Sequence, residues 1–197
     1  MKSLHRNDLF QWSHFDEERN IDFHSVLWVR PEGNIAFDPL PLSEHDRAHL
    51  RELGGAAWVV LTNGDHLRAA VDLMKWTEAR LAAPAGERGK IGIPVDRWIA
   101  DGETIVPGLV AYACAGSKTP GELALHLAPE TLITGDLVRG QRANRLNLLP
   151  PAKLTDADAA KRSVARLAAI PGLTTVLVGD GWPVFHGASE QLARLAT

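Results

Sequence analysis

The clearest hydrophobic pattern in the chain is an apolar run that stops at turn residues and then passes into helical spacing. Residues 58–61 form the run and predict a buried strand, which ends at the turn and capping residues 62–65. Apolar side chains then recur three and four residues apart over residues 67–74, which predicts a helix that continues to about Leu81. Polar side chains therefore gather where a strand gives way to a helix, and ligands of α/β proteins usually bind at such places.

The rest of the chain predicts short strands with a few helices between them. Strands are expected at residues 9–12, 21–29, 35–37, 90–94, 106–112, 123–127, 131–134 and 176–178. Further helices are expected at residues 43–53, 156–169 and 189–195, the first two capped by Ser43 and Thr155. Residues 141–154 follow no regular pattern and are expected to be irregular. Short turns join the strands of residues 21–37 into one hairpin and those of residues 123–134 into another.

Three of the expected strands run directly into a turn that carries a carboxylate. These turns hold Asp65, Asp136 and Asp180. Carboxylates gathered at one edge of a sheet repel each other, so they need a metal ion, an Arg or Lys partner, a raised pKa or full solvation. The pattern predicts a polar site at that edge and leaves these four solutions open.

Composition limits the classes of function. The 197 residues, 45% of them hydrophobic, suit one domain spanning residues 1–197. A net charge of −3 without a Lys/Arg block argues against a nucleic-acid partner, and a single cysteine, Cys114, excludes an intrachain disulfide and a cysteine-based zinc cluster. No apolar stretch approaches the roughly 20 residues of a membrane span and no hydrophobic leader is visible, so we expect a cytoplasmic protein without a membrane partner. The sequence leaves the oligomeric state open, a homo-oligomer included.

Five segments stand in an order that suggests a known fold. They are a hairpin ending in Asp38-Pro39, a strand ending in Thr62, the turn at residues 116–121, the strand into Gly135-Asp136, and the strand into residues 179–181. In this order the chain resembles the metallo-β-lactamase fold superfamily, which places its T-H-x-H-x-D-H motif after the second segment, and G-H-T-P-G, G-D and G-H-G at the last three. The resemblance implies an α+β fold, an αββα sandwich of two facing mixed sheets with outer helices and a site along one edge.

The first motif departs from the family pattern. Aligned without gaps from Thr62, Asn63 and Asp65 replace its first two histidines, and Arg68 replaces its last. A gapped alignment instead keeps Asp65-His66 as the family's D-H pair. The chain therefore resembles a divergent member with a degenerate metal motif.

The later motifs depart as well. Ser117 replaces the histidine of the family's turn, with Lys118 as an extra residue, and Asp180 replaces the final histidine. Asp136 alone is retained without ambiguity, at the position where the family's aspartate bridges two metals. The resemblance implies that the ordinary dinuclear zinc site is missing.

One hypothesis is a metal-dependent hydrolase of unknown substrate with a remodelled site. Asp65, His66, Asp136 and Asp180 would supply mostly oxygen ligands with one imidazole, a set that favours Mg²⁺, Mn²⁺ or Fe²⁺ over a nitrogen-rich zinc site. A bound water could then be activated for hydrolysis. The cofactor under this hypothesis is one divalent metal, Zn, Mn, Fe or Mg, and the sequence identifies no catalytic residue.

The other hypothesis is a non-catalytic, metal-free relative. Arg68 and Lys118 occupy former ligand positions, and two fixed cations near the three aspartates could replace the charge of the lost metals. The same cleft would then bind a small molecule or a protein partner. Its expected residues, besides the aspartates, are Asn63, Arg68, Ser117, Lys118 and His186.

Overall fold

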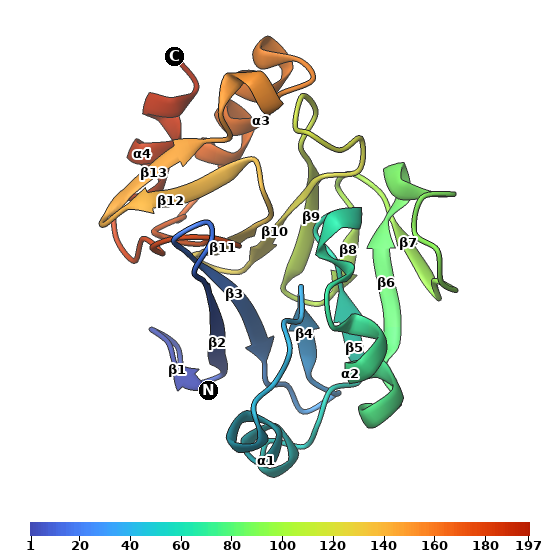
Figure 1. The fold of residues 1–197 in the computed structure, drawn as a ribbon. Coiled ribbons are helices and arrows are strands. Elements are labelled where there is room, and N and C mark those ends of the chain that lie inside the picture. The colour runs from blue at the N-terminus through green and yellow to red at the C-terminus, as the bar shows by residue number, and fades with distance from the viewer.

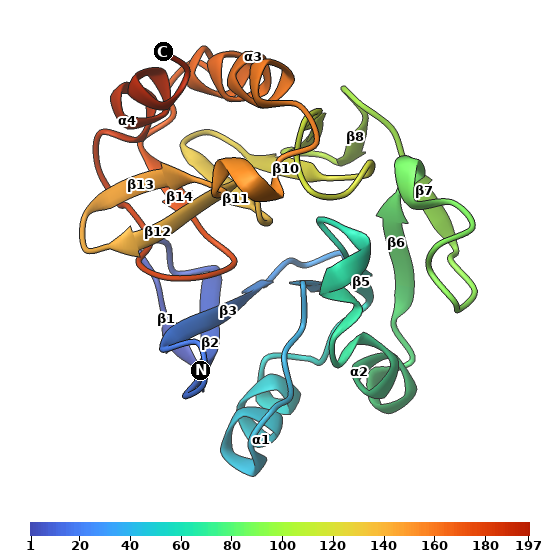
Figure 2. The same cartoon turned by 45° about the horizontal axis from the view of Figure 1, so that its top comes forward.

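Two β-sheets face each other, and a pair of helices covers the outer face of each (Figure 1 and Figure 2). The computed structural model describes residues 1–197. The larger sheet has the order β1 to β7, formed by Lys2–Ser3, Leu9–Asp16, Ile21–Trp28, Ile35–Phe37, Trp58–Val60, Arg80–Pro84 and Arg97–Ile99. The smaller has the order β14-β11-β10-β9-β8, formed by Thr175–Leu177, Thr131–Thr134, Leu123–Leu127, Leu109–Ala113 and Thr104–Val106.

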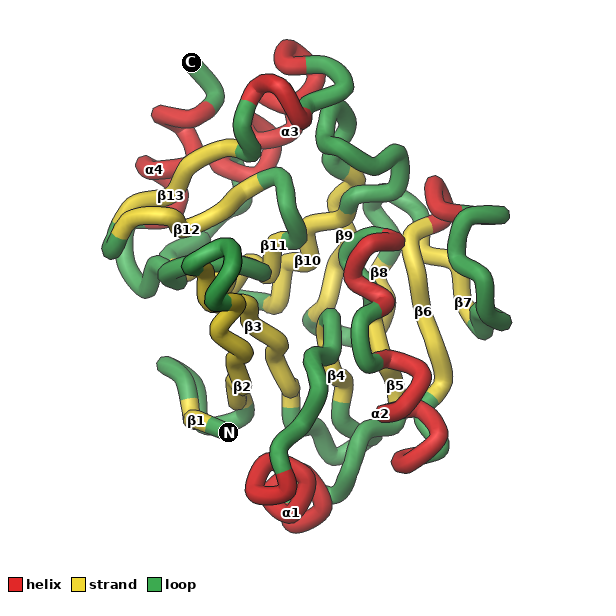
Figure 3. Tube along the Cα trace, in the orientation of Figure 1, coloured by secondary structure: helices red, strands yellow, loops and turns green.

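The helices lie outside the sheets, one pair on each side (Figure 3). The larger sheet carries α1 (Glu44–Glu52) and α2 (Ala70–Thr77), and the smaller carries α3 (Ala157–Ala168) and α4 (Ala188–Leu195). A separate hairpin is formed by β12 (Val138–Arg142) and β13 (Arg145–Leu148). Short 3₁₀ turns lie at Gly64–Leu67, Ala85–Glu87 and Pro151–Lys153. None of the helices combines the length and the apolar character needed to cross a membrane.

Side chains that alternate along the strands divide the interior into three apolar layers. Phe37 and Leu125 point between the sheets and belong to a central cluster of 16 buried residues. Their neighbours point the other way, Ala36 toward the layer under α1 and α2 and Ala124 toward the layer under α3 and α4. The expected αββα sandwich is confirmed, because each sheet buries both of its faces.

The site lies where the carboxyl ends of parallel strands meet. Strands β4 and β5 are parallel neighbours in one sheet, and β11 and β14 are parallel neighbours in the other. Asp38 follows β4 and Thr62 follows β5, while Asp136 and Asp180 follow β11 and β14. Four segments that are far apart in the chain therefore deliver polar side chains to one edge.

The predicted bounds of the helix after residues 58–61, expected to continue to about Leu81, are wrong. Residues Gly64–Leu67 form a 3₁₀ turn. Helix α2 begins at Ala70 and ends at Thr77, because the next residue, Glu78, has a left-handed φ of 60°. Residues Arg80–Pro84 are strand β6, which lies between β5 and the edge strand β7. Their Arg, Leu and Ala side chains favour helix locally, but parallel pairing with β5 on one side and β7 on the other decides the outcome.

Four smaller expectations are also wrong. The strand expected at residues 90–94 lies in turns, and Arg97–Ile99 takes the edge position beside β6. The strand expected at residues 106–112 is two strands, because Pro107-Gly108 forms a hairpin turn between β8 and β9. Residues 141–154, expected to be irregular, hold the end of β12 and all of β13. Buried and exposed side chains do not alternate regularly along these residues, so no strand pattern was visible. Asp156, not Thr155, caps α3.

The central layer generates a stability prediction. Leu125 is fully buried between the sheets, so Leu125→Ala should lower the free energy of unfolding by about 2–5 kcal/mol, from lost apolar burial and the cavity left behind. Leu195→Ala, at the half-exposed end of α4, is the matched control and should cost about 1 kcal/mol or less. Urea unfolding at neutral pH measures both. Equal losses would contradict the assignment of Leu125 to the central core.

Candidate functional site

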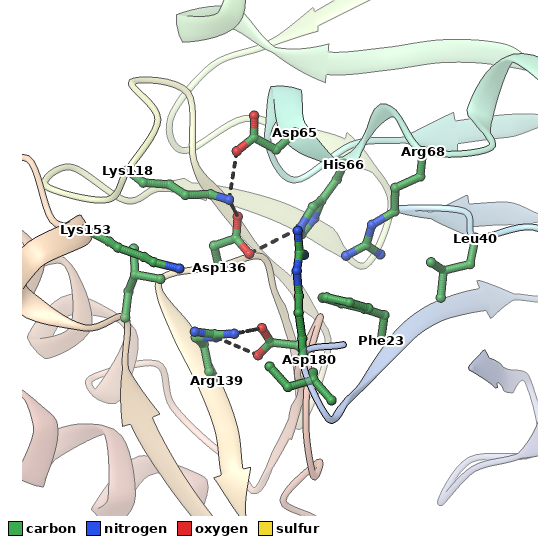
Figure 4. A pocket seen from close by; sticks show the side chains of 13 residues that line it. Phe23, Leu40, Asp65, His66, Arg68, Lys118, Asp136, Arg139, Lys153 and Asp180 are labelled. Carbon is green, nitrogen blue, oxygen red and sulfur yellow. Dashed lines mark hydrogen bonds and ion pairs between the residues drawn. The ribbon is translucent and has the colours of Figure 1, made fainter. Parts of the chain in front are cut away.

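A cavity of about 880 Å³ opens at the edge where the two sheets deliver their polar residues (Figure 4). It is lined by Arg19, Ile21, Phe23, Leu40, Asp65, His66, Arg68, Lys118, Asp136, Arg139, Leu149, Lys153 and Asp180. Most of the site residues predicted from the sequence therefore lie together on the wall of this cavity. They are Asp65, His66, Arg68, Lys118, Asp136 and Asp180. Asn63 and Ser117 are buried behind it, and His186 is exposed before α4 and does not line the cavity.

Asp38 anchors the inner wall of the cavity. This buried carboxylate accepts hydrogen bonds from the backbone N of Thr62 at 2.8 Å and from its Oγ1 at 2.6 Å. It also lies 2.9 Å from Nδ1 of His66, which the 3₁₀ turn after β5 brings inward. The contacts tie the ends of β4 and β5 together and fix the orientation of the imidazole.

His66 lies between two carboxylates. Its Nε2 is 3.4 Å from Oδ1 of Asp136, opposite the contact with Asp38. Burial by itself would lower the pKa of His66, but the charges of Asp38 and Asp136 outweigh it and raise the pKa to about 9. The imidazole is therefore protonated at neutral pH and donates from both nitrogens.

Lys118 bridges two of the predicted metal ligands. Its Nζ lies 2.7 Å from Asp65 Oδ2 and 2.7 Å from Asp136 Oδ2 (Figure 4). Burial opposes the charge of the ammonium group, but the two carboxylates hold the pKa of Lys118 above its ordinary value. Burial would raise the pKa of Asp136, yet its bonds to His66 and Lys118 hold it far below the usual range.

Arg139 pairs with the aspartate of the last motif. Its Nε lies 2.8 Å and 2.6 Å from the two carboxylate oxygens of Asp180, and its Nη2 also donates to Oδ2. Gln141 Nε2 adds a further hydrogen bond of 3.2 Å. Sequence reasoning missed Arg139 because its strand, β12, has no clear apolar pattern. The available signal was its spacing, three residues after Asp136.

Glu122 supports the turn that carries Asp136. Its buried carboxylate accepts from the backbone N of Asp136 at 2.6 Å and of Leu137 at 3.1 Å, and from Asn63 Nδ2 at 3.0 Å. Burial and the nearby charge of Asp136 raise the pKa of Glu122. Sequence reasoning also missed this residue, although an acidic side chain directly before a buried strand was a visible signal.

Gly135 is required by this arrangement. A Cβ at Gly135 would lie 2.5 Å from Glu122 Oε1 and 2.7 Å from Thr62 Oγ1, which is closer than real side chains approach. Ser117 completes the buried layer, because its hydroxyl donates to Glu122 Oε2 at 3.3 Å. Asn63 and Ser117 therefore position the wall and do not face the cavity.

Arg68 does not pair with the aspartates in the way the sequence suggested. Its Nη1 donates to the backbone carbonyls of His24 and Asp38, each at 3.2 Å. Burial lowers the pKa of Arg68, opposed by the charges of the surrounding aspartates. The aspartates are instead paired with Lys118 and Arg139, which reach them from other segments of the chain: Lys118 from the turn after β9 and Arg139 from β12.

The donor set does not fit the zinc site that the resemblance implies. His66 is the one imidazole on the cavity wall, and its Nδ1 is held by Asp38. Asp65 and Asp136 form ion pairs with Lys118, and Asp180 forms one with Arg139. No group of three or more His, Cys, Asp or Glu side chains is placed to hold a metal ion. The resemblance implies a zinc site with several histidines, whereas this wall offers one imidazole and carboxylates already paired with cations, so we derive no chemical step through a metal.

The protonated His66 generates a pH prediction. Because its folded pKa is about 9 against 6.5 in the unfolded chain, its stabilisation is complete below pH 6.5 and lost as the pH rises through 9. We expect the free energy of unfolding to fall by about 3 kcal/mol between pH 6.5 and 9.5 from this residue. Urea unfolding across this range measures the slope.

Two variants test the origin of that slope. His66→Gln should remove most of it, while His45→Gln, at an exposed position of α1, should keep it. A direct NMR titration of the His66 ring should give a pKa well above 7. A value near or below 6.5 would contradict the pairing of the imidazole with Asp38 and Asp136.

Comparisons with known proteins agree with the fold. The family model described as the metallo-beta-lactamase superfamily matches residues 1–197. A metallo-beta-lactamase from Pontibacter korlensis is 16% identical, with 98% of this chain and 97% of that chain covered and a TM-score of 0.76. One from Erythrobacter litoralis is 17% identical, with 98% and 94% covered and a TM-score of 0.75. FIM-1 from Pseudomonas aeruginosa, in its mono-zinc form, is 14% identical, with 95% and 89% covered and a TM-score of 0.71.

No curated protein matches the sequence. Structural likeness at such low identity supports the fold and carries no activity with it. The match of the family model over the whole chain, together with the αββα architecture, shows that the chain belongs to the metallo-beta-lactamase superfamily.

Proposed function

We propose that this chain is a metal-independent member of its superfamily whose cleft binds a small molecule without hydrolysing it. One observation carries the proposal: Lys118 Nζ lies 2.7 Å from both Asp65 and Asp136, where the family motifs place metal ligands. An ammonium ion at hydrogen-bond distance from two carboxylates offsets one of their two charges and repels a divalent cation at the same point. Arg139 neutralises Asp180 in the same manner.

The protonation states of the wall also favour binding over hydrolysis. A general base must be free to accept a proton from water. His66 is already protonated at neutral pH, and the carboxylates of Asp136 and Asp180 are engaged by His66, Lys118 and Arg139. The cavity of about 880 Å³ falls within the usual size range of small-molecule sites.

Metal content tests the proposal. The wild-type protein, dialysed against a mixture of Zn²⁺ and Mn²⁺ and then against metal-free buffer, should retain far less than one metal ion per chain by elemental analysis. It should also show no rise in melting temperature with added Mn²⁺. Stoichiometric metal that disappears in Asp136→Ala would overturn the proposal and support the metal-dependent hydrolase.

Removal of the lysine should recreate metal affinity. Lys118→Gln leaves Asp65 and Asp136 without their cation, so it should be less stable than wild type and regain about 2–6 °C in melting temperature with millimolar Mn²⁺. Lys153→Gln is the matched control, because Lys153 lines the same cavity without meeting a carboxylate. A Mn²⁺ response equal in both variants would show that Lys118 is not what keeps the metal out.

A further inference from the structure

Resting on the proposed function, we infer that the ligand is a small organic anion, with a phosphate or carboxylate head held between Arg68 and Lys153 and an apolar body packed on Phe23. Five cationic side chains line the cavity, and three aspartates oppose them. The cations are Arg19, Arg68, Lys118, Arg139 and Lys153. The wall is therefore positive, although the whole chain carries a net charge of −3.

The internal ion pairs use up the aspartates and leave particular cations available. Lys118 and Arg139 pair with Asp65, Asp136 and Asp180, so two positive charges meet three negative ones. The charge of His66 is matched by Asp38, which lies behind the wall, and that of Arg19 by Asp16. Arg68 and Lys153 have no carboxylate partner and together exceed the one remaining negative charge, so the field within the cavity favours an anion and disfavours a cation.

Arg68 has unused hydrogen-bonding capacity. Its two bonds to backbone carbonyls both come from Nη1, and its Nε and Nη2 have no acceptor within the protein. The side chain is half-buried, so water reaches it poorly, while a guanidinium group presents a planar fork that suits the two oxygens of a carboxylate or phosphate. An arginine with unused N–H donors and little access to water is a favourable partner for an oxyanion.

Lys153 supplies the second cation from another part of the chain. It ends the 3₁₀ turn before α3, and its Nζ makes no hydrogen bond or ion pair within the protein. In Figure 4, Lys153 and Arg68 reach into the cavity from opposite sides. Two cations placed in this way can hold one head group between them or two charges of a dianion.

The apolar part of the ligand is indicated by the surface beside the arginines. The guanidinium carbons of Arg68 and Arg19 lie 5.5 Å and 5.8 Å from the centre of the Phe23 ring. Apolar side chains continue this surface at Ile21, Leu40 and Leu149. A purely inorganic anion would leave this surface unused, whereas an aryl or alkyl group attached to the head group would cover it.

Isothermal titration calorimetry with simple probes tests this inference. Phenyl phosphate and benzoate carry both parts, inorganic phosphate carries only the head group, and benzyl alcohol carries only the apolar part. We expect the first two to bind at least tenfold more tightly than the last two, and their affinity to fall as ionic strength rises from about 0.05 to about 0.5 M. Whichever of phenyl phosphate and benzoate binds more tightly identifies the head group.

Variants place the ligand on the named residues. Arg68→Gln should weaken phenyl phosphate binding by about 10–100-fold, through loss of charge-assisted hydrogen bonds. Because Arg68 also holds two backbone carbonyls, Lys153→Gln on its exposed turn is the second variant, with an expected loss of about 3–30-fold. Arg162→Gln, at an exposed position of α3 away from the cavity, should bind as wild type does.

The outcomes separate this inference from the proposed function. No binding of either organic anion, or equal affinity for phenyl phosphate in wild type and Lys153→Gln, would overturn the inference while metal exclusion by Lys118 stood. Inorganic phosphate that binds as tightly as phenyl phosphate would also overturn it, because the apolar surface would then play no part. Stoichiometric metal in the wild-type protein would instead overturn the proposed function.

Discussion

The arrangement of this site depends on one electrostatic constraint: carboxylates delivered to a shared sheet edge must each meet a positive group. Asp38, Asp136 and Asp180 are all largely buried, and burial of an unpaired charge costs several kcal/mol. The chain meets this constraint with its own side chains, namely protonated His66, Lys118 and Arg139. The turns around the cavity hold their positions because these pairs join the ends of strands from both sheets.

The superfamily scaffold is thus kept while the chemistry at its edge differs from that implied by the family motifs. The three apolar layers form without any contribution from the charged residues of the site, since the strands bury both faces. Asp38, Thr62 and Gly135 preserve the shape of the edge, through hydrogen bonds and a close approach that only glycine allows. We propose that lysine and arginine at this edge turn a metal centre into a positively lined pocket.

Sequence reasoning predicted most of the residues that the structure brings together at the cavity, but it assigned their partners incompletely. Asp65, His66 and Lys118 were found because they follow a buried strand or a turn that resembles a family motif. Arg139 and Glu122 were missed, since the partner of each is distant in sequence: Arg139 meets the carboxylate of Asp180, and Glu122 accepts from the backbone N of Asp136. The start of strand β6 was taken for the end of a helix, and the strand itself was not predicted, because its pairing with neighbouring strands leaves no local pattern.

Through its resemblance to the superfamily, the sequence by itself determined the layered fold, the order of the motifs and the loss of the histidines, because the identity and order of residues can be read along the chain. Which cation meets which carboxylate was decided only in the tertiary structure. Arg68 stands in the former metal motif yet binds backbone carbonyls, and Arg139 pairs with Asp180 across 41 positions of the chain. Charge pairing depends on distances of a few ångströms, and those are set by how the two sheets bring their strand ends together.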